Sequence, residues 1–410
     1  MKLSGDILEI YNLFHSAGYK LHVVGGAVRD HLLGKDSNDV DLVTDATPDQ
    51  VETVLAGQTI SGAKVRFDFT GRSFGVMRIF NGPGYEIATF RKDITVGRRP
   101  EVEIGATIEE DSMRRDFTCN ALYWNITEGK VIDLVGGVKD IENKVLMTPG
   151  NPKDRFNEDR LRIFRAIRFA SRFGWKLDDR IAAAIRVDNS MLGPDANGKL
   201  IPISQERIYD EFQKGIAQAK NITNYVEFMN AFCLLRHVFH LQAIPGITEK
   251  YIHTYSGKNI IFGNYEPDQV DQVATMILYL AGSLREIPND IIDHLVRVCK
   301  FPRKVAVNVN FLLNLATTDL SKEPEWILLQ SAKRKTELND IEIINFFSNP
   351  IFSDKIPIML ALLLYSPSYV NGQMLKEQGF TGKAIGEELK RIQIEKLNQL
   401  KKSVTCLTNS

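Results

Sequence analysis

The sequence predicts an α+β protein, in which a head of short strands and helices precedes a long, all-helical region. In the head, an apolar strand over residues 21–24 runs into Gly25-Gly26 and then into a helix over residues 27–33. A Pro- and Gly-rich segment at residues 149–152 marks a boundary. Beyond it, helical periodicity with few strand signals continues for roughly 260 residues, which is too long for one helical piece.

The opening of the head is a predicted helix over residues 4–17. Apolar side chains recur there at helical spacing, Ser4 is a suitable N-cap, and Gly18 is a suitable stop. The alternation of apolar and polar residues predicts three more strands, two of them joined as a hairpin by the turn at 81–84. These strands are expected at residues 40–43, 75–80 and 85–90.

The helical region carries several breaks that divide it. They lie near residues 193–202, 245–246, 255–267 and 324. We therefore expect a head, a neck, a body and a tail, with boundaries at residues 1–148, 149–220, 221–320 and 321–410.

The composition is that of an ordinary globular protein and does not by itself indicate a nucleic-acid partner. Lys plus Arg and Asp plus Glu both number 51, so any basic surface must be local. No apolar run approaches the roughly 18 residues of a membrane helix, and no stable protein partner is indicated. The four cysteines, Cys119, Cys233, Cys299 and Cys406, are far apart and form no CxxC pair. This pattern favours a reducing compartment, and we expect a cytoplasmic protein.

The first chemical constellation is the Gly25-Gly26 turn followed by Asp39 and Asp41. Glycines before a helix let the backbone approach an anion, and Arg29, one turn into the helix, is placed to reach a triphosphate. Alternation on the strand predicts that Asp39 and Asp41 share one face. Two such carboxylates repel each other unless a cation lies between them, and Mg²⁺ is the cation that carboxylates and nucleotide phosphates share. Two Mg²⁺ ions are expected.

A third carboxylate would complete such a metal site. Glu86, on the second strand of the predicted hairpin, is the candidate, and a solvated strand residue is the alternative interpretation. Asp111 and Asp116 compete for the same role.

These motifs together resemble a known family, the class II tRNA nucleotidyltransferases and bacterial poly(A) polymerases, which have a polymerase-beta-like head. Five ordered segments of residues 20–215 carry the resemblance. They are GGAVRD with DVD at residues 25–41, RRDFT at 114–118, DLVGG at 133–137, EDRLR at 158–162 and SQERI at 204–208. The resemblance implies that the head binds metal and nucleotide, that the neck selects the base, and that body and tail hold the acceptor arm of tRNA.

Base selection is expected from Asp159 and Arg162, which lie three residues apart on a predicted helix and so project from one face. Asp accepts and Arg donates hydrogen bonds, which suits the Watson–Crick edges of cytosine and adenine. Uracil and guanine place a carbonyl opposite the carboxylate, which costs about 1–3 kcal/mol in a desolvated site. The resemblance implies this role, and it implies nucleotide contacts for Arg115, Arg165 and Arg168.

The implied activity is template-independent addition of C, C and A to the 3′ end of tRNA from CTP and ATP. The reaction is an in-line, two-metal transfer that releases pyrophosphate. A basic loop between Arg91 and Glu101 supports complete CCA addition, because in the family a loop at this place is associated with the switch from CTP to ATP. The residues of this loop that we expect to act in the switch are Arg91, Asp93, Gly97 and Arg98. The alternatives are a poly(A) polymerase, a partial CC- or A-adding enzyme, and a non-catalytic tRNA-binding protein.

Overall fold

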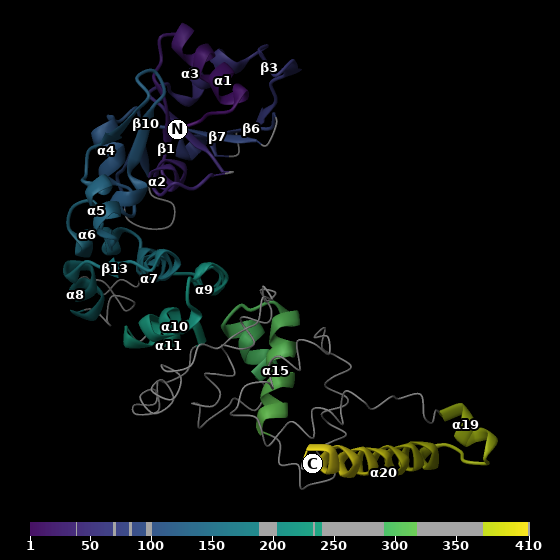
Figure 1. Cartoon of the computed structure of the whole chain (residues 1–410). Coiled ribbons are helices and arrows are strands. Elements are labelled where there is room, and N and C mark those ends of the chain that lie inside the picture. Colours follow the sequence, from purple (N-terminus) through teal and green to yellow (C-terminus); the bar gives the residue numbers. More distant parts are fainter. Residues whose placement is uncertain are drawn as a thin grey trace. The chain divides into compact units, whose positions relative to one another are not determined.

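The computed structural model describes residues 1–37, 39–68, 71–81, 84–95, 101–187, 203–232, 234–239, 291–317 and 372–408. The chain forms two compact units, Met1–Leu234 and Leu235–Ser410. Each unit is described by itself, and Figure 1 labels the elements of both.

A mixed, seven-stranded sheet is the centre of the head, in the order β11-β10-β1-β2-β7-β6-β5 (Figure 1). Neighbouring strands pair antiparallel except β2 and β7, which are parallel. The β6–β7 pair confirms the predicted hairpin. The strands are β1 (Leu21–Val24), β2 (Asp41–Thr44), β5 (Phe67–Asp68), β6 (Val76–Ile79), β7 (Tyr85–Thr89), β10 (Leu122–Asn125) and β11 (Lys130–Asp133).

Helices and small two-stranded sheets complete the head. Helix α1 (Gly5–Ser16) begins as predicted, because the Ser4 hydroxyl accepts the N–H of Ile7. Helix α3 starts with a capping box formed by Thr47 and Gln50. The remaining elements are α2 (Gly26–Leu32), α3 (Pro48–Leu55), α4 (Ile108–Met113), α5 (Gly137–Asn143), the 3-10 turns η1 (Arg72–Phe74) and η2 (Thr118–Asn120), and the pairs β3 (Thr59–Ile60) with β4 (Ala63–Lys64) and β8 (Arg91–Asp93) with β9 (Val102–Ile104).

Helix α7, whose side chains are buried over most of its length, is contacted by three of the helices that follow the head. The prediction that one helix carries both Asp159 and Arg162 is wrong, because α6 ends at Glu158 and α7 begins at Leu161. Asp159 between them is extended, with φ −145° and ψ 103°. This part contains α6 (Pro152–Glu158), α7 (Leu161–Phe173), α8 (Asp179–Val187), α9 (Gln205–Gln218), α10 (Ile222–Ala231) and the pair β12 (Val145–Leu146) with β13 (Lys176–Leu177).

The second unit is helical wherever the structure describes it. Its elements are α11 (Leu235–Phe239), α14 (Ile291–Asp293), the π-helix η3 (His294–Val298), α15 (Arg303–Thr317), α19 (Gly372–Glu377) and α20 (Lys383–Thr408). The His294 ring lies 2.8 Å from the carbonyl oxygen of Phe239. Among the described helices of either unit, none has the length and apolar character needed to cross a membrane. The division into head, neck, body and tail stays a prediction.

Candidate active site

The Gly-Gly turn between β1 and α2 requires glycine for its backbone. Gly25 has φ 75° and ψ −127°, a region that residues with a Cβ rarely adopt. A Cβ at this position would lie 3.7 Å from Nη1 of Arg115 and 3.6 Å from the carbonyl oxygen of Asn120. The turn therefore brings the start of α2 against the segment that carries Arg115.

Asp41 is the first residue of β2 and lies directly opposite Glu86 of β7 in the parallel pair. Partners in register point to the same face of a sheet, so the two carboxylates share one face. Asp39 precedes the strand instead of lying on it, which corrects the prediction that alternation along β2 aligns the two aspartates. The charge of Asp39 nevertheless helps to raise the pKa of Asp41, two residues further along the chain.

The ionisation of Asp41 shows how these charges converge. Partial burial raises the pKa of Asp41 to about 6, and the charges of Asp39 and Glu86 act in the same direction. The charge of Arg115 acts in the opposite direction, and its guanidinium approaches Gly25, the residue after Val24, which pairs with Asp41. A carboxylate whose charge is disfavoured by burial and by neighbouring carboxylates is one that a bound cation would stabilise.

Neither of the competing carboxylates is available for a metal. Asp111 is fully buried, and its oxygens accept hydrogen bonds from Arg114, Arg115 and the Tyr123 hydroxyl at 2.7–3.1 Å. Burial would raise the pKa of Asp116, but Arg165 outweighs it and holds the pKa at about 2. Glu86 is half exposed, with Arg78 at 3.7 Å, and it alone of the three lies beside Asp41.

The donor set suits Mg²⁺, which takes one or two carboxylates together with phosphate oxygens and water. In the described ranges, no three His, Cys, Asp or Glu side chains are already gathered closely enough to hold a metal by themselves. The remaining ligands would therefore come from a bound triphosphate, in keeping with the adjacent Gly-Gly turn.

The two arginines predicted to contact the nucleotide from the head differ in their surroundings. Arg115 bonds Asp111 and Tyr123 through Nε and Nη2, which leaves Nη1 directed at Gly25. Arg29 is only 4% exposed, and its guanidinium is shared between Asp30 and Asn120. This geometry does not support the predicted contact of Arg29 with a triphosphate. It indicates that Arg29 holds the first turn of α2 in place.

Asp159 and Arg162, the predicted base-selecting pair, do not project from one helix face, because Asp159 lies at the break between α6 and α7. The Asp159 carboxylate accepts the N–H of Leu161 at 3.1 Å and binds Arg207 at 2.7 Å. Arg162 donates to Glu158 and to the carbonyl oxygens of Arg155 and Arg114 at 2.7–3.0 Å. The last of these bonds joins α7 to the segment of the head that carries Arg115.

Arg165 and Arg168, the two neck arginines predicted to contact the nucleotide, are each held by a carboxylate. Arg165 binds Asp116 at 2.6 Å, and Arg168 binds Glu211 of α9 at 2.6 Å. Glu211 is only 4% exposed and also lies 3.3 Å from Arg165. Glu211 was not among the residues predicted from the sequence, although its position among the apolar side chains of α9 was a signal of burial.

The predicted switching loop is described only at its ends. Arg91 and Asp93 lie on strand β8, which pairs antiparallel with β9. Their side chains are 3.7 Å apart, and Arg91 also donates to the carbonyl oxygen of Phe74. Gly97 and Arg98 lie outside the described residues.

Comparison with known proteins identifies the family. Residues 21–147 match the family described as the Poly A polymerase head domain. A CCA-adding enzyme of Pediococcus pentosaceus is 30% identical over 351 residues, which are 82% of this chain and 78% of that protein. The chain belongs to the CCA-adding enzyme family. Another CCA-adding enzyme, from Lactobacillus helveticus, is 28% identical over 94% of this chain and 90% of its own length.

Solved structures of CCA-adding enzymes share the fold. The Bacillus stearothermophilus CCA-adding enzyme, solved in complex with CTP, superposes with a TM-score of 0.66 at 26% identity, covering 96% of this chain and 92% of that one. The Thermotoga maritima CCA-adding enzyme, solved with tRNA, gives a TM-score of 0.62 at 20% identity over 99% and 96% of the two chains, which shows the fold alone.

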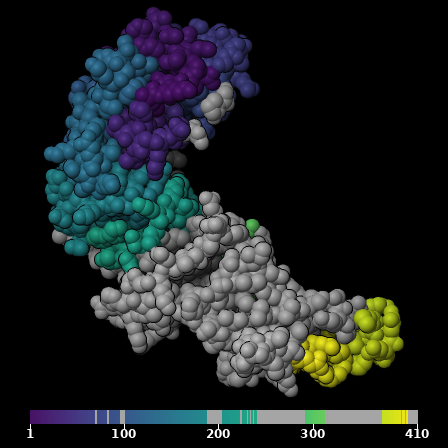
Figure 2. All heavy atoms as spheres, viewed as in Figure 1, coloured from purple at the N-terminus to yellow at the C-terminus, as the bar shows by residue number. Residues whose placement is uncertain are grey.

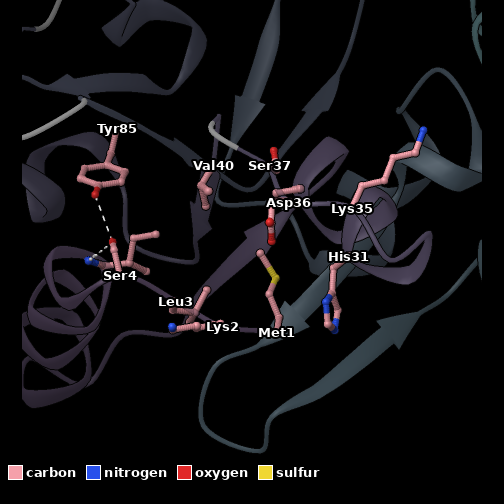
Figure 3. Close-up of a pocket in the computed structure, with 12 residues that line it drawn as sticks. Met1, Lys2, Leu3, Ser4, His31, Lys35, Asp36, Ser37, Val40 and Tyr85 are labelled. Atoms are coloured by element: carbon pink, nitrogen blue, oxygen red, sulfur yellow. Dashed lines mark hydrogen bonds between the residues drawn. The ribbon is translucent and has the colours of Figure 1, made fainter.

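A pocket of about 350 Å³ is lined by the N-terminal segment, by α2 and by residues between α2 and β2, and neither Asp41 nor Glu86 lines it (Figure 3). Tyr85 lines it and bonds Ser4 of the N-terminal segment, whereas the next residue, Glu86, points to the opposite face of β7. The pocket is therefore not the place where the carboxylates converge. In the space-filling view, the head and the helices α7 and α9 present a continuous surface (Figure 2).

Proposed function

We propose that this protein adds C, C and A to the 3′ end of tRNA, taking the nucleotides from CTP and ATP without a template. One observation carries the proposal: Arg115 approaches the Gly25 turn, and Asp41, whose pKa is raised in part by the charge of Asp39, lies directly opposite Glu86 on the neighbouring strand. This arrangement combines a cation site with a guanidinium and a glycine turn that suit a triphosphate.

Asp39 and Asp41, with Glu86 beside them, would hold the Mg²⁺ ions. When bound, Mg²⁺ supplies charge stabilisation for the attacking 3′-hydroxyl and for the leaving pyrophosphate. The protein's own groups position the reactants: Arg115 directs Nη1 to the Gly25 turn, and Asp111 and Tyr123 fix that guanidinium. No covalent intermediate with the protein is needed, so catalysis rests on positioning and electrostatics.

The neck supplies a donor and an acceptor for the base. Arg162 has five N–H groups, and its bonds to Glu158, Arg155 and Arg114 use three of them. Asp159 likewise keeps an acceptor position beyond those used by Leu161 and Arg207. The Asp159 acceptor beside the Arg162 donor matches the Watson–Crick edges of cytosine and adenine. Uracil and guanine would place a carbonyl opposite the Asp159 carboxylate, which disfavours their binding.

The helices after the neck would hold the acceptor arm of tRNA through phosphates and shape. CCA-adding enzymes solved with CTP, with ATP and with tRNA support these three partners. The cysteines Cys119 and Cys299 are free and buried, which suits a reducing compartment, and we place the activity in the cytoplasm.

Transfer assays with purified protein and Mg²⁺ test the proposal. A tRNA transcript that ends before CCA is offered CTP, ATP, both together, UTP or GTP, and products are sized at single-nucleotide resolution. The proposal expects two additions with CTP alone and three with both nucleotides. A long ladder of products with ATP alone would indicate a poly(A) polymerase. Addition of CC without A would indicate a partial enzyme, and no extension with any nucleotide would indicate a tRNA-binding protein without catalytic activity.

A further inference from the structure

The carboxylate of Asp159 is held by an arginine from another helix. Arg207, in the first turn of α9, donates through Nη2 to Oδ2 of Asp159 at 2.7 Å and through Nη1 to Oδ1 at 3.3 Å. Both side chains are about three-quarters buried, at 23% and 25% exposed. Two parallel bonds from one guanidinium fix the plane of a carboxylate as well as its position.

The hydrogen bonds leave one acceptor position on this carboxylate. An ionised carboxylate has about four lone-pair positions. On Oδ1, the bonds from Leu161 and Arg207 use both, and on Oδ2 the bond from Arg207 uses one. The remaining position lies on Oδ2, and its direction is set by the guanidinium of Arg207.

The helix that carries Arg207 is itself fixed against α7. Glu211, one turn further along α9, binds Arg168 of α7 at 2.6 Å and lies 3.3 Å from Arg165. Figure 1 shows α7 and α9 as neighbours. Because this contact is buried, the position of Arg207 relative to the start of α7 is set by packing as well as by charge.

We propose that Arg207 is a positioning residue for base selection, which turns the last acceptor position of Asp159 toward the exocyclic amine of the incoming base. This inference rests on the proposed function, because it assigns the part of the neck that makes the Asp159 acceptor selective. Without Arg207, the carboxylate can rotate at the break between α6 and α7. A carboxylate in several orientations opposes the carbonyl of uracil less consistently.

The test compares kcat/KM for CTP and for UTP in single-nucleotide addition to a tRNA transcript that ends before CCA. The variants are Arg207→Ala, Arg207→Lys, which keeps the charge without the two-pronged geometry, and the double variant Arg207→Ala with Asp159→Ala. Lys214→Ala is the control, because Lys214 is an exposed cation on the same helix. Affinities for CTP and UTP without tRNA are measured alongside.

The expected result is a fall of roughly tenfold in the CTP-over-UTP ratio for Arg207→Ala, a smaller fall for Arg207→Lys, and none for Lys214→Ala. In the double variant the ratio should equal that of Asp159→Ala alone, because Arg207 acts through Asp159. A purely structural role would lower both rates together and leave the ratio unchanged.

A wild-type ratio in folded Arg207→Ala, or losses that add in the double variant, would overturn the inference. If Arg207→Ala does not fold, an unchanged CTP-over-UTP ratio in Arg207→Lys would also overturn the inference. If the wild-type protein extends no tRNA, the proposed function fails. The affinities then decide the role of Arg207, since a CTP preference that the substitution does not change contradicts it.

Discussion

Asp41 and Glu86 lie directly opposite each other on β2 and β7, the one parallel pair of the described seven-stranded sheet. Their carboxylates share a face, and the charge of Glu86 adds to the effect of burial and of Asp39 in raising the pKa of Asp41 to about 6. Repulsion of this kind weakens the fold unless a cation relieves it. The pairing therefore links the strand register to the metal requirement of the proposed reaction.

Replacing Glu86 should lower activity without weakening the fold. Glu86→Gln removes one repelling charge from Asp41 and takes one oxygen ligand from the proposed cation site. We expect transfer to fall about 10- to 100-fold, with an unchanged or slightly higher melting temperature. Transfer rates over a Mg²⁺ titration and thermal unfolding measure both effects.

Asp111→Asn is the contrasting substitution, because Asp111 is buried and holds Arg114 and Arg115. It should destabilise the protein by about 3 kcal/mol, since two partly buried guanidinium groups lose their counter-charge. A stable Asp111→Asn protein with selectively lost metal dependence would instead make Asp111 the third carboxylate.

The ionisation of Asp41 predicts a pH-dependent stability in the metal-free protein. Its pKa is raised to about 6 in the folded state, so the unfolded chain ionises first as pH rises. The stability penalty is therefore absent below about pH 4 and complete above about pH 6. After allowance for solvent screening, Asp41→Asn should raise stability by about 1 kcal/mol at pH 8 and by nothing at pH 4.

Thermal unfolding of both proteins at the two pH values checks this. Added Mg²⁺ should stabilise the wild-type protein at pH 8 and have less effect on Asp41→Asn. An Asp41→Asn protein that is less stable than wild type at pH 8 without metal would contradict the proposed repulsion.

The sequence was sufficient to locate the site because its order of elements is local. A strand, the Gly25 turn, a helix and Asp41 follow one another within a short stretch, and each has its own pattern. The prediction that Asp39 lies on the strand was wrong, because the alternation was extended back beyond Asp41, where the strand begins. The choice of Glu86 over Asp111 could not be made from sequence, since it depends on which strands pair.

The neck was predicted less well because its contacts join distant segments. Apolar spacing continues through Asp159, so periodicity gives no sign of the break, which the side-chain bonds to Leu161 and Arg207 stabilise. Arg168 was predicted to contact the nucleotide, and its partner Glu211 lies 43 residues further along the chain, on another helix. The pattern of residues within a single helix does not predict such pairs.

Removing Glu211 should destabilise the first unit. Glu211→Ala leaves Arg168 buried without its carboxylate, and we expect a loss of about 3 kcal/mol in the free energy of unfolding. Denaturant unfolding measures the loss. Glu206→Ala, at an exposed position of the same helix, is the control and should change stability by less than about 0.5 kcal/mol. Equal effects of the two substitutions would argue against the buried network.

Gly136 and Gly137, the glycine pair after β11, are required for different reasons, which separate substitutions can distinguish. A Cβ on Gly137 would lie 2.2 Å from the backbone oxygen of Thr118, so this position tolerates no side chain, whereas a Cβ on Gly136 would meet nothing within 4 Å. Gly136 has φ 82°, and its replacement costs only backbone strain. We expect Gly137→Ala to destabilise the head by about 3 kcal/mol, by forcing α5 away from η2, and Gly136→Ala by about 1 kcal/mol. Denaturant unfolding of both variants gives the comparison, and a Gly137→Ala protein as stable as Gly136→Ala would show that the helix moves away freely.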